Sequence, residues 1–311
     1  MSEVDIILRS ATQDVGEALS RDFRVHKAHA AGVAALAPEV RARVRIVVTA
    51  GSIGLAAAEI ALLPQLGLIS CTGTGYDEVD VAAARARGIG ITHGASSNAA
   101  AVADHAMALL LAQLRDLPRF DANARAGLWR SGLTPQPIPT GKRLGILGLG
   151  AVGERIGRRA EGFEMQVGYH TRTPKPALPW RAFPSALALA EWADHLVVAA
   201  PGGAGTHHLV DAAVLRALGP RGRLVNIGRG SVVDNAALVA GLREGIIGGA
   251  GLDVYEGEPE IPAALCDMRN VILTPHIAGW APEAREMTIA QLRENIRRFL
   301  AGEPLASPIP G

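Results

Sequence analysis

The sequence predicts an α/β protein made of two doubly wound parallel-sheet domains. Short runs rich in β-branched residues alternate with Ala- and Leu-rich helical runs over most of the 311 residues. Such alternation is typical of strand–helix–strand units with parallel strands. It pauses at the Gly- and Pro-rich stretch SGLTPQPIPTGK and then restarts, which indicates two halves joined by this connection between domains. The chain length also suits two domains.

The first half alternates strand and helix before one long helix. We expect strands at residues 46–50, 67–71 and 88–93, and helices at 55–66 and 79–88. The long helix is expected from about Asn98 to Leu117, where Pro118 would end it.

The second half is longer and more regular. Strands are expected at residues 143–147, 164–170, 195–200, 223–227, 248–254 and 270–275. Helices are expected between them at 151–163, 185–193, 211–218 and 235–245, and a last long helix from Pro282 to Leu300.

Composition excludes several classes of function. Lysines and arginines (31) nearly balance acids (30), so no basic surface for nucleic acid is indicated. The longest apolar run, around MALLLAQL, is too short and too interrupted for a membrane span. Two cysteines, Cys71 and Cys266, suggest neither a disulfide framework nor a metal site. No secretory signal is recognised, and we expect a soluble, cytoplasmic protein.

A glycine-rich turn opens the second half. In RLGILGLGAVGERIG a strand precedes Gly148, Gly150 and Gly153, and an amphipathic helix follows them. In that context the three glycines indicate a dinucleotide site: the first permits the turn, the second lets the backbone approach a pyrophosphate, and the third allows close helix–strand packing. An ordinary strand–helix turn is the competing interpretation.

Two other glycine-rich stretches match less well. In CTGTGYDEVD, Glu78 stands where a third glycine would be, but the backbone there suits a small anion such as a carboxylate. GGAGLD leads into a strand, so tight packing is the better interpretation.

The strand ending at His170 predicts which dinucleotide is bound. An acid at this point would bond the ribose 2′-hydroxyl of NAD. The sequence instead has Thr171, Arg172 and Thr173, with Lys175 nearby. An arginine fork between hydroxyls suits a 2′-phosphate, so NADP(H) is favoured and NAD(H) is expected to bind more weakly. The competing interpretation is a surface arginine.

Polar residues follow three further predicted strands. They are Arg229 in LVNIGRGSVVD, Asp253 and Glu258 in GLDVYEGEPE, and His276 in VILTPHIAGW. Ligands of open α/β sheets bind beyond the carboxyl ends of the strands. A turn cation, a solvated acid and a structural histidine are the alternatives for each taken alone. By contrast, the adjacent His207 and His208 have no acid or cysteine near them in sequence, and we expect a loop beside the cofactor there rather than a metal site.

These motifs resemble one known family, the D-isomer-specific 2-hydroxyacid dehydrogenases. The similarity covers nearly the whole chain, and within the family it is greatest to bacterial glyoxylate/hydroxypyruvate reductases that use NADPH. The motifs that carry it are CTGTGYDEVD, ADHAMALLLAQLR, GKRLGILGLGAVG, LVNIGRGSVVD, AGLDVYEGEP and NVILTPHIAG.

The resemblance implies a role for each polar residue. His276 would donate a proton to the carbonyl oxygen of a 2-oxo acid, and Glu258 would favour the imidazolium. Arg229 would hold the substrate carboxylate and polarise the carbonyl. Substrate contacts would also come from Ser52, Gly73, Thr74 and Gly75. Cofactor contacts would come from Gly148, Gly150, Ala151, Val152, Gly153, Thr171, Arg172, Thr173, Pro201, Thr206, Ile227, Asp253 and Gly279.

The resemblance also implies a domain plan. Residues 1–98 and 285–311 would form a flavodoxin-like substrate domain, and residues 99–284 a Rossmann nucleotide-binding domain, with a cleft between them that closes on the substrate. The long helix from Asn98 would help to form a homodimer. No metal, membrane or nucleic-acid partner is expected.

Other functions remain open on the sequence alone. The substrate could be a bulkier 2-oxo acid such as hydroxyphenylpyruvate or 2-ketogluconate, or the protein could be a 3-phosphoglycerate dehydrogenase. Formate dehydrogenases of this fold carry Gln where this chain has Glu258. A nucleotide-sensing corepressor is the non-enzymatic alternative.

Overall fold

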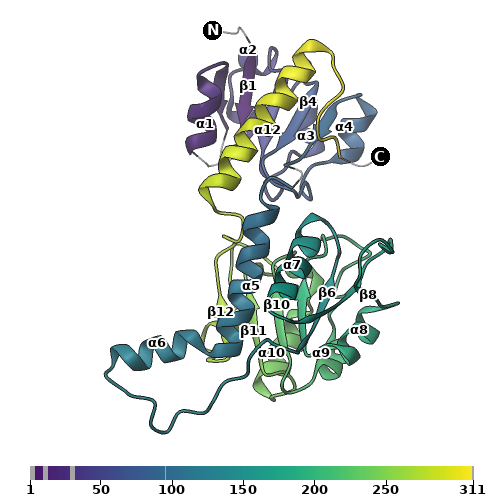
Figure 1. Ribbon diagram of the computed structural model, residues 1–311. Helices are drawn as coiled ribbons and strands as arrows, with labels where there is room; N and C mark the ends of the chain where they lie inside the picture. Colours follow the sequence, from purple (N-terminus) through teal and green to yellow (C-terminus); the bar gives the residue numbers. More distant parts are fainter. Residues whose placement is uncertain (1–3, 10–12, 29–31, 95, 310–311) are drawn as a thin grey trace. The chain divides into compact units, whose positions relative to one another are not determined.

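The computed structural model describes residues 4–9, 13–28, 32–94 and 96–309. It divides into two compact units (Figure 1). Unit 1 comprises Met1–Asn98 and Trp280–Gly311, and unit 2 comprises Ala99–Gly279. Each unit is built on a parallel sheet with helices, so the predicted fold class is confirmed.

Unit 1 contains a doubly wound sheet. Within the described residues its strand order is β2-β1-β3-β4-β5, the flavodoxin-like order. The strands are β1 (Asp5–Leu8), β2 (Arg24–Lys27), β3 (Ile46–Thr49), β4 (Leu68–Cys71) and β5 (Gly90–Thr92). The last three were predicted. The first two were not: β2 is an edge strand with the polar sequence RVHK, and β1, the buried run DIIL, was missed although it is as long as β3 and β4.

Helices cover both faces of this sheet. They are α1 (Gln13–Ser20), α2 (Pro38–Arg41), α3 (Ala57–Ala61), α4 (Val81–Ala86) and α12 (Pro282–Ala301), with a 3₁₀ turn at Val33–Ala35. Leu292 and Ile296 of α12 pack on the face that holds Ile6 and Leu8. Alternate strand residues such as Ile7 fill the opposite core. The strands β1, β3 and β4 are buried on both faces, as is typical of parallel sheets.

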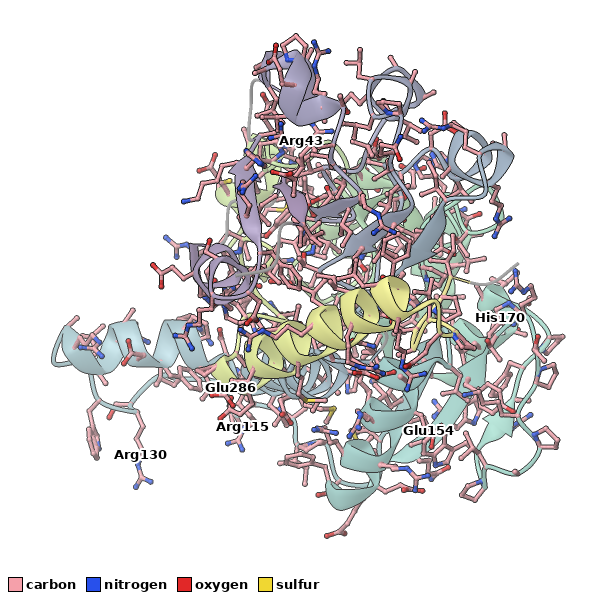
Figure 2. All side chains as sticks on the ribbon, turned by 90° about the horizontal axis from the view of Figure 1, so that it is seen from above. Arg43, Arg115, Arg130, Glu154, His170 and Glu286 are labelled. Atoms are coloured by element: carbon pink, nitrogen blue, oxygen red, sulfur yellow. The ribbon has the colours of Figure 1, made fainter. Side chains whose placement is uncertain are left out.

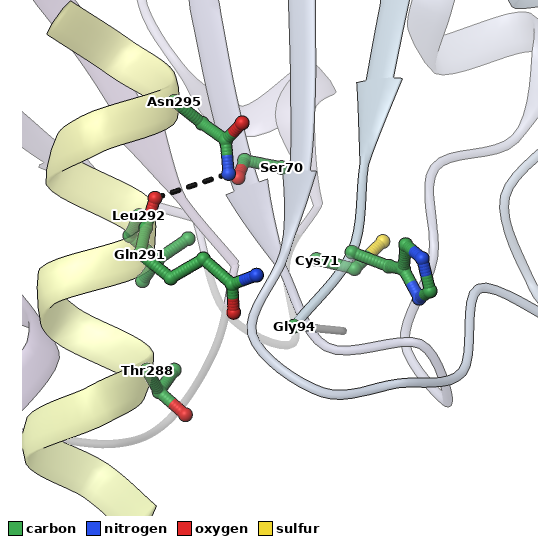
Figure 3. Close-up of a pocket in the computed structure, with 8 residues that line it drawn as sticks. Ser70, Cys71, Gly94, Thr288, Gln291, Leu292 and Asn295 are labelled. Carbon is green, nitrogen blue, oxygen red and sulfur yellow. Dashed lines mark hydrogen bonds between the residues drawn. The ribbon is translucent and has the colours of Figure 1, made fainter. Parts of the chain in front are cut away.

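A small hollow beside α12 is lined by side chains that serve the structure of unit 1 (Figure 3). Its wall includes Asn295, which is 1% exposed. The amide nitrogen of Asn295 donates to Gln291 O and to Ser307 Oγ, each at 3.0 Å. Its amide oxygen accepts from the backbone N–H groups of Ala306 and Ser307 at 2.9 and 3.2 Å. The Asn295 side chain therefore anchors the segment at Ala306 and Ser307 to α12.

Unit 2 contains a longer sheet of Rossmann order. Within the described residues the order is β12-β11-β10-β9-β6-β7-β8, with every pairing parallel. The strands are β6 (Arg143–Leu147), β7 (Gln166–His170), β8 (Arg181–Ala182), β9 (His195–Val198), β10 (Arg223–Asn226), β11 (Gly249–Leu252) and β12 (Val271–Leu273). The chain order reverses between β6 and β9. Ligands of such sheets bind at this switch point.

The helices of unit 2 include all the predicted ones and two that were not predicted. They are α5 (Ala99–Arg115), α6 (Leu117–Arg125), α7 (Ala151–Gly162), α8 (Ala186–Trp192), α9 (Ala212–Leu218), α10 (Asn235–Arg243) and α11 (Ala263–Cys266), with a 3₁₀ turn at Gly230–Val232. A Cβ at Gly251 of β11 would lie 3.0 Å from Leu109 Cβ of α5. The glycines of GGAGLD therefore serve close packing, as predicted.

The helices that were not predicted are α11, which has only four residues, and α6, where Pro118 was expected to end helical structure. Asp116 adopts a left-handed conformation (φ 51°) and ends α5, and Pro118 then occupies the first turn of a new helix. Proline is tolerated there because its missing N–H has no intrahelical partner. The prediction that 131–142 connects the domains was wrong: this stretch joins α6 to β6 inside unit 2. No helix among the described residues has the length and apolar character to span a membrane.

Candidate active site

Three strand ends of unit 2 carry the predicted catalytic side chains. Arg229 follows β10, Glu258 follows β11, and His276 follows β12. These strands are neighbours in one parallel sheet, so their carboxyl ends lie along the same edge. The fold thus gathers residues from three separate segments.

His276 and Glu258 form a direct pair. His276 Nδ1 and Glu258 Oε2 are 2.6 Å apart, and the other carboxylate oxygen accepts the backbone N–H of Tyr255 at 2.9 Å. The His276 side chain is 47% exposed. One ring nitrogen is therefore held by the carboxylate, which leaves Nε2 for a ligand.

Each residue of the pair shifts the pKa of the other in the direction that favours the charged form: the pKa of His276 is raised and that of Glu258 is lowered. The hydrogen bond to Glu258 raises the pKa of His276 above its ordinary value, although burial acts in the opposite direction. Burial would raise the pKa of Glu258, but the hydrogen bonds from His276 and from Tyr255 N–H outweigh it and lower that pKa. A general acid with a raised pKa stays protonated to higher pH.

Asp253 fixes the backbone that carries His276. The backbone of His276 is left-handed (φ 55°), which is uncommon for a residue other than glycine and frequent at functional sites. Asp253 O accepts its N–H at 2.9 Å. The Asp253 carboxylate accepts from Thr274 Oγ1 at 2.6 Å and from the N–H groups of Ile277 and Ala278 at 2.9 Å.

This network gives Asp253 a positioning role that the sequence did not reveal. Its side chain is 1% exposed and already bonded, whereas the sequence pointed to a cofactor contact. His105 of α5 bonds Thr274 Oγ1 at 3.0 Å and so supports the same segment.

Arg229 is placed by a buried asparagine. Asn226 is 1% exposed; its amide donates to Arg229 O at 3.0 Å and accepts from Gly228 N at 3.1 Å. The positive charge of Arg229 lowers the pKa of both Glu258 and His276, so it acts on the pair. Sequence reasoning missed Asn226 and Tyr255. The available signal was a polar residue ending an otherwise apolar strand, as in RLVN.

The glycine turn after β6 has the geometry of a pyrophosphate cradle. Gly148 has φ 91°, and a Cβ there would lie 2.6 Å from Ala200. A Cβ on Gly153 would lie 2.2 Å from Gly148 O. Gly150 precedes α7 and has open space where a Cβ would be. A dinucleotide fits this turn, because its phosphates can meet the free N–H groups that begin α7 with Ala151 and Val152.

The end of β7 lies next to this turn, since Gly148 N donates to His170 O at 2.9 Å. Arg172 and Thr173 are exposed and Thr171 is half-buried. No acid in the described part of the chain pairs with Arg172. Lys175 is 3.7 Å from Glu154 of α7; Figure 2 labels Glu154 and His170 on this unit.

The remaining predicted cofactor residues lie on other strand-end loops of unit 2. The hydroxyl of Thr206 donates to Pro201 O at 2.7 Å, so it stabilises its own loop after β9. Ile227 is 7% exposed and packs in the core. Gly279 is half-buried at the end of the unit.

The predicted substrate residues of unit 1 lie on two adjacent loops. Ser52 follows β3, and Gly73, Thr74 and Gly75 follow β4. The loops touch, because a Cβ on Gly51 would lie 2.1 Å from Gly75 O. Ser52 and Thr74 are exposed. Among the described residues none accepts a hydrogen bond from the N–H of Thr74 or Gly75, which suits an anion.

Comparison with known proteins identifies the family. Residues 107–278 match the model of the D-isomer specific 2-hydroxyacid dehydrogenase NAD binding domain. Glyoxylate/hydroxypyruvate reductase A of Arabidopsis thaliana is 39% identical over 86% of this chain and 86% of its own length. Hydroxyphenylpyruvate reductase of Plectranthus scutellarioides is also 39% identical, over 86% and 85%.

A solved structure agrees over the whole chain. It is the NADPH-dependent glyoxylate/hydroxypyruvate reductase of Sinorhizobium meliloti in complex with NADP and malonate, with a TM-score of 0.92 and 37% identity over 99% of this chain and 97% of that one. The resemblance seen in the motifs is therefore confirmed. The chain belongs to the D-isomer specific 2-hydroxyacid dehydrogenase family of nicotinamide-dependent oxidoreductases.

Proposed function

We propose that this protein reduces a small 2-oxo acid, glyoxylate or hydroxypyruvate, to the D-2-hydroxy acid with NADPH. The observation that carries the proposal is the His276–Glu258 pair at 2.6 Å, on the same sheet edge as Arg229. Relatives and a structural neighbour named for these substrates support the choice.

The residues divide the chemistry between them. Bound NADPH supplies a hydride to the carbonyl carbon of the substrate. The imidazolium of His276 donates its Nε2 proton to the carbonyl oxygen, and Glu258 stabilises the imidazolium before transfer. Arg229 pairs with the substrate carboxylate through its planar fork. We assign further substrate contacts to Ser52 and the backbone of Gly73, Thr74 and Gly75.

The preference for NADPH over NADH rests on Arg172. Gly148, Gly150 and Gly153 give the backbone turn for the pyrophosphate, with Ala151, Val152, Pro201, Thr206, Ile227, Asp253 and Gly279 as further proposed contacts. Arg172 is exposed beside that turn, between Thr171 and Thr173. A guanidinium at this point favours a 2′-phosphate.

A substrate panel tests the proposal. Initial rates are measured with glyoxylate, hydroxypyruvate, phenylpyruvate and 2-ketogluconate, each with NADPH and NADH, by following nicotinamide absorbance. We expect the highest kcat/KM for glyoxylate or hydroxypyruvate with NADPH, and a D-configured product from hydroxypyruvate. NADPH binding without turnover of any 2-oxo acid would instead support the corepressor-like alternative.

A bulkier aromatic substrate is the second candidate. The hydroxyphenylpyruvate reductase is as similar in sequence as the glyoxylate/hydroxypyruvate reductase. In the same panel, a higher kcat/KM for phenylpyruvate than for glyoxylate would select this candidate.

Replacing Glu258 by glutamine is expected to change the pH profile. Glu258→Gln removes the charge that raises the pKa of His276. Reduction needs protonated His276, so its rate falls as pH rises through that pKa. In the variant we expect the fall to begin at lower pH, so activity is lost more strongly at pH 8 than at pH 6. Initial rates with saturating NADPH, from pH 5.5 to 9, measure this; a parallel loss at all pH values would contradict the assignment.

We also propose that the protein is a homodimer joined through an arm of unit 2, residues 117–140. The arm consists of α6 and the following loop, and it extends away from the sheet of its unit (Figures 1 and 2; Arg130 is labelled on the loop). Four of its large apolar side chains are exposed: Leu117 (53%), Leu128 (59%), Trp129 (80%) and Ile138 (53%). Apolar groups collected on one exposed segment favour a protein interface.

Sedimentation velocity tests the arm. We expect the native protein to sediment as a dimer and the double variant Leu128→Ser, Trp129→Ser to sediment as a monomer at the same concentration. Leu187→Ser is the matched control, because Leu187 is also exposed (42%) but lies on α8, outside the arm. An unchanged mass for the double variant would exclude the arm as the interface.

A further inference from the structure

Two adjacent histidines and a distant glutamate converge on one point of unit 2. His207 and His208 lie on the loop after β9, and Glu256 follows β11, 48 residues beyond His208. Glu256 Oε1 is 3.3 Å from His208 Nε2 and 3.8 Å from His207 Nε2. The sequence places no acid near the histidines, so only the fold reveals this cluster, which we call the His–His–Glu cluster.

The backbone brings the two imidazoles to the same side of the loop. Consecutive residues of an extended chain point in opposite directions, but His208 is left-handed (φ 50°). As a result the rings stack, with centroids 3.8 Å apart and an interplanar angle of 25°. Both Nε2 atoms therefore face the same carboxylate.

Backbone contacts hold the three segments together. His208 N donates to Ser231 O at 2.9 Å. A Cβ on Gly230 would lie 2.2 Å from Glu256 N, so the 230–231 turn is packed directly against the segment that carries Glu256. The fold of unit 2 thus fixes the backbone positions of the residues in the cluster.

The geometry points to a binding site for a divalent transition metal, and we propose that the His–His–Glu cluster binds Zn²⁺ or a similar ion. Ligand atoms about 2.0–2.2 Å from a tetrahedral zinc are roughly 3.3 Å from one another. Glu256 Oε1 lies 3.3 and 3.8 Å from the two Nε2 atoms, and the three ligand atoms all lie within 4.8 Å of one another, so rotation of the stacked imidazoles would direct both Nε2 atoms at one ion. Two imidazoles favour zinc, nickel or copper over magnesium or calcium. All three side chains are partly exposed, from 35% to 56%, so water can complete the coordination.

A metal here would join two functional segments. His207 and His208 directly follow Thr206 of the proposed cofactor loop, and Glu256 is two residues before Glu258. On the proposed function, the metal would restrain the cofactor loop against the segment that carries the catalytic glutamate. Metal binding itself is independent of that function and can be measured without substrate.

Calorimetric titration of the purified, chelator-treated protein with ZnCl₂ tests the site, with MgCl₂ as the comparison cation. We expect one equivalent of Zn²⁺ to bind and no heat from Mg²⁺. His207→Ala, His208→Asn and Glu256→Gln should each weaken Zn²⁺ binding by at least about tenfold. Asparagine is chosen at 208 because it tolerates the left-handed backbone, and thermal melting checks that each variant folds.

His276→Asn is the matched control, because His276 and Glu258 are the other exposed histidine–glutamate pair of the unit. Its Zn²⁺ affinity should equal that of the native protein. The proposal is overturned if the native protein binds no Zn²⁺, or if binding survives the three cluster substitutions; loss of binding in His276→Asn would place the ion at the other pair. Either result leaves the reductase assignment intact, since that depends on turnover without added metal.

Discussion

Replacing His276 by alanine is expected to lower kcat for 2-oxo acid reduction by about 10²- to 10⁴-fold, the usual contribution of a positioned general acid. The reason is geometric. Glu258 holds one ring nitrogen at 2.6 Å, and the charge of Arg229 lies close enough to act on the pair. Without the imidazole, the carbonyl oxygen must take its proton from water. NADPH affinity should remain unchanged, because the glycine turn after β6 is a separate part of unit 2.

The left-handed backbone of His276 requires a second variant. Alanine is strained at φ 55°, so a loss in His276→Ala could arise from a displaced loop. His276→Asn accepts this conformation more readily and equally lacks a proton donor of suitable pKa. Both variants should lose turnover, while fluorescence titration shows native NADPH affinity and the melting temperature stays close to native. Near-native kcat in His276→Asn would contradict the role of His276 as the acid.

Most apolar strands were predictable, including the edge strands β5 and β12, whereas the polar edge strands β2 and β8 were not. The runs ending at Thr49 and Asn226 are apolar because helices cover both faces of the sheet. β2 and β8 lie at sheet edges with exposed residues, so no apolar run marks them. The break between α5 and α6 depends on the left-handed Asp116, a conformation that neighbouring residues do not specify.

The position of the candidate site residues at strand ends was predictable, but the contacts that support them were not. Arg229, Glu258 and His276 follow strands that the alternation revealed, so their common edge could be inferred. The bonds of Asp253 to the 276–278 segment, and of Asn226 to the turn at Arg229, join residues through tertiary contacts. The pairing of Glu256 with His208 is of the same kind. Spacing in sequence carries no information about such pairs.

Arg172 should decide which nicotinamide dinucleotide the enzyme prefers. We expect Arg172→Ala to raise the KM for NADPH by about 10- to 100-fold, because a charged hydrogen bond contributes about 1.5–3 kcal/mol. The KM for NADH should stay the same, since NADH has no 2′-phosphate. Arg172 is exposed beside the glycine turn, and no described acid pairs with it, so its guanidinium needs no rearrangement to meet the phosphate. Initial rates with each cofactor at saturating substrate give both KM values.

Two further variants separate a specific contact from general positive charge. Lys175 is near Arg172 in sequence, but its ammonium lies 3.7 Å from Glu154; Lys175→Ala should therefore raise the KM for NADPH much less. Arg172→Asp introduces the acid that binds the ribose 2′-hydroxyl in NAD-dependent relatives of this fold, and should reverse the preference toward NADH. If Arg172→Ala changes both KM values equally, Arg172 makes no specific contact with the 2′-phosphate and is only a surface residue.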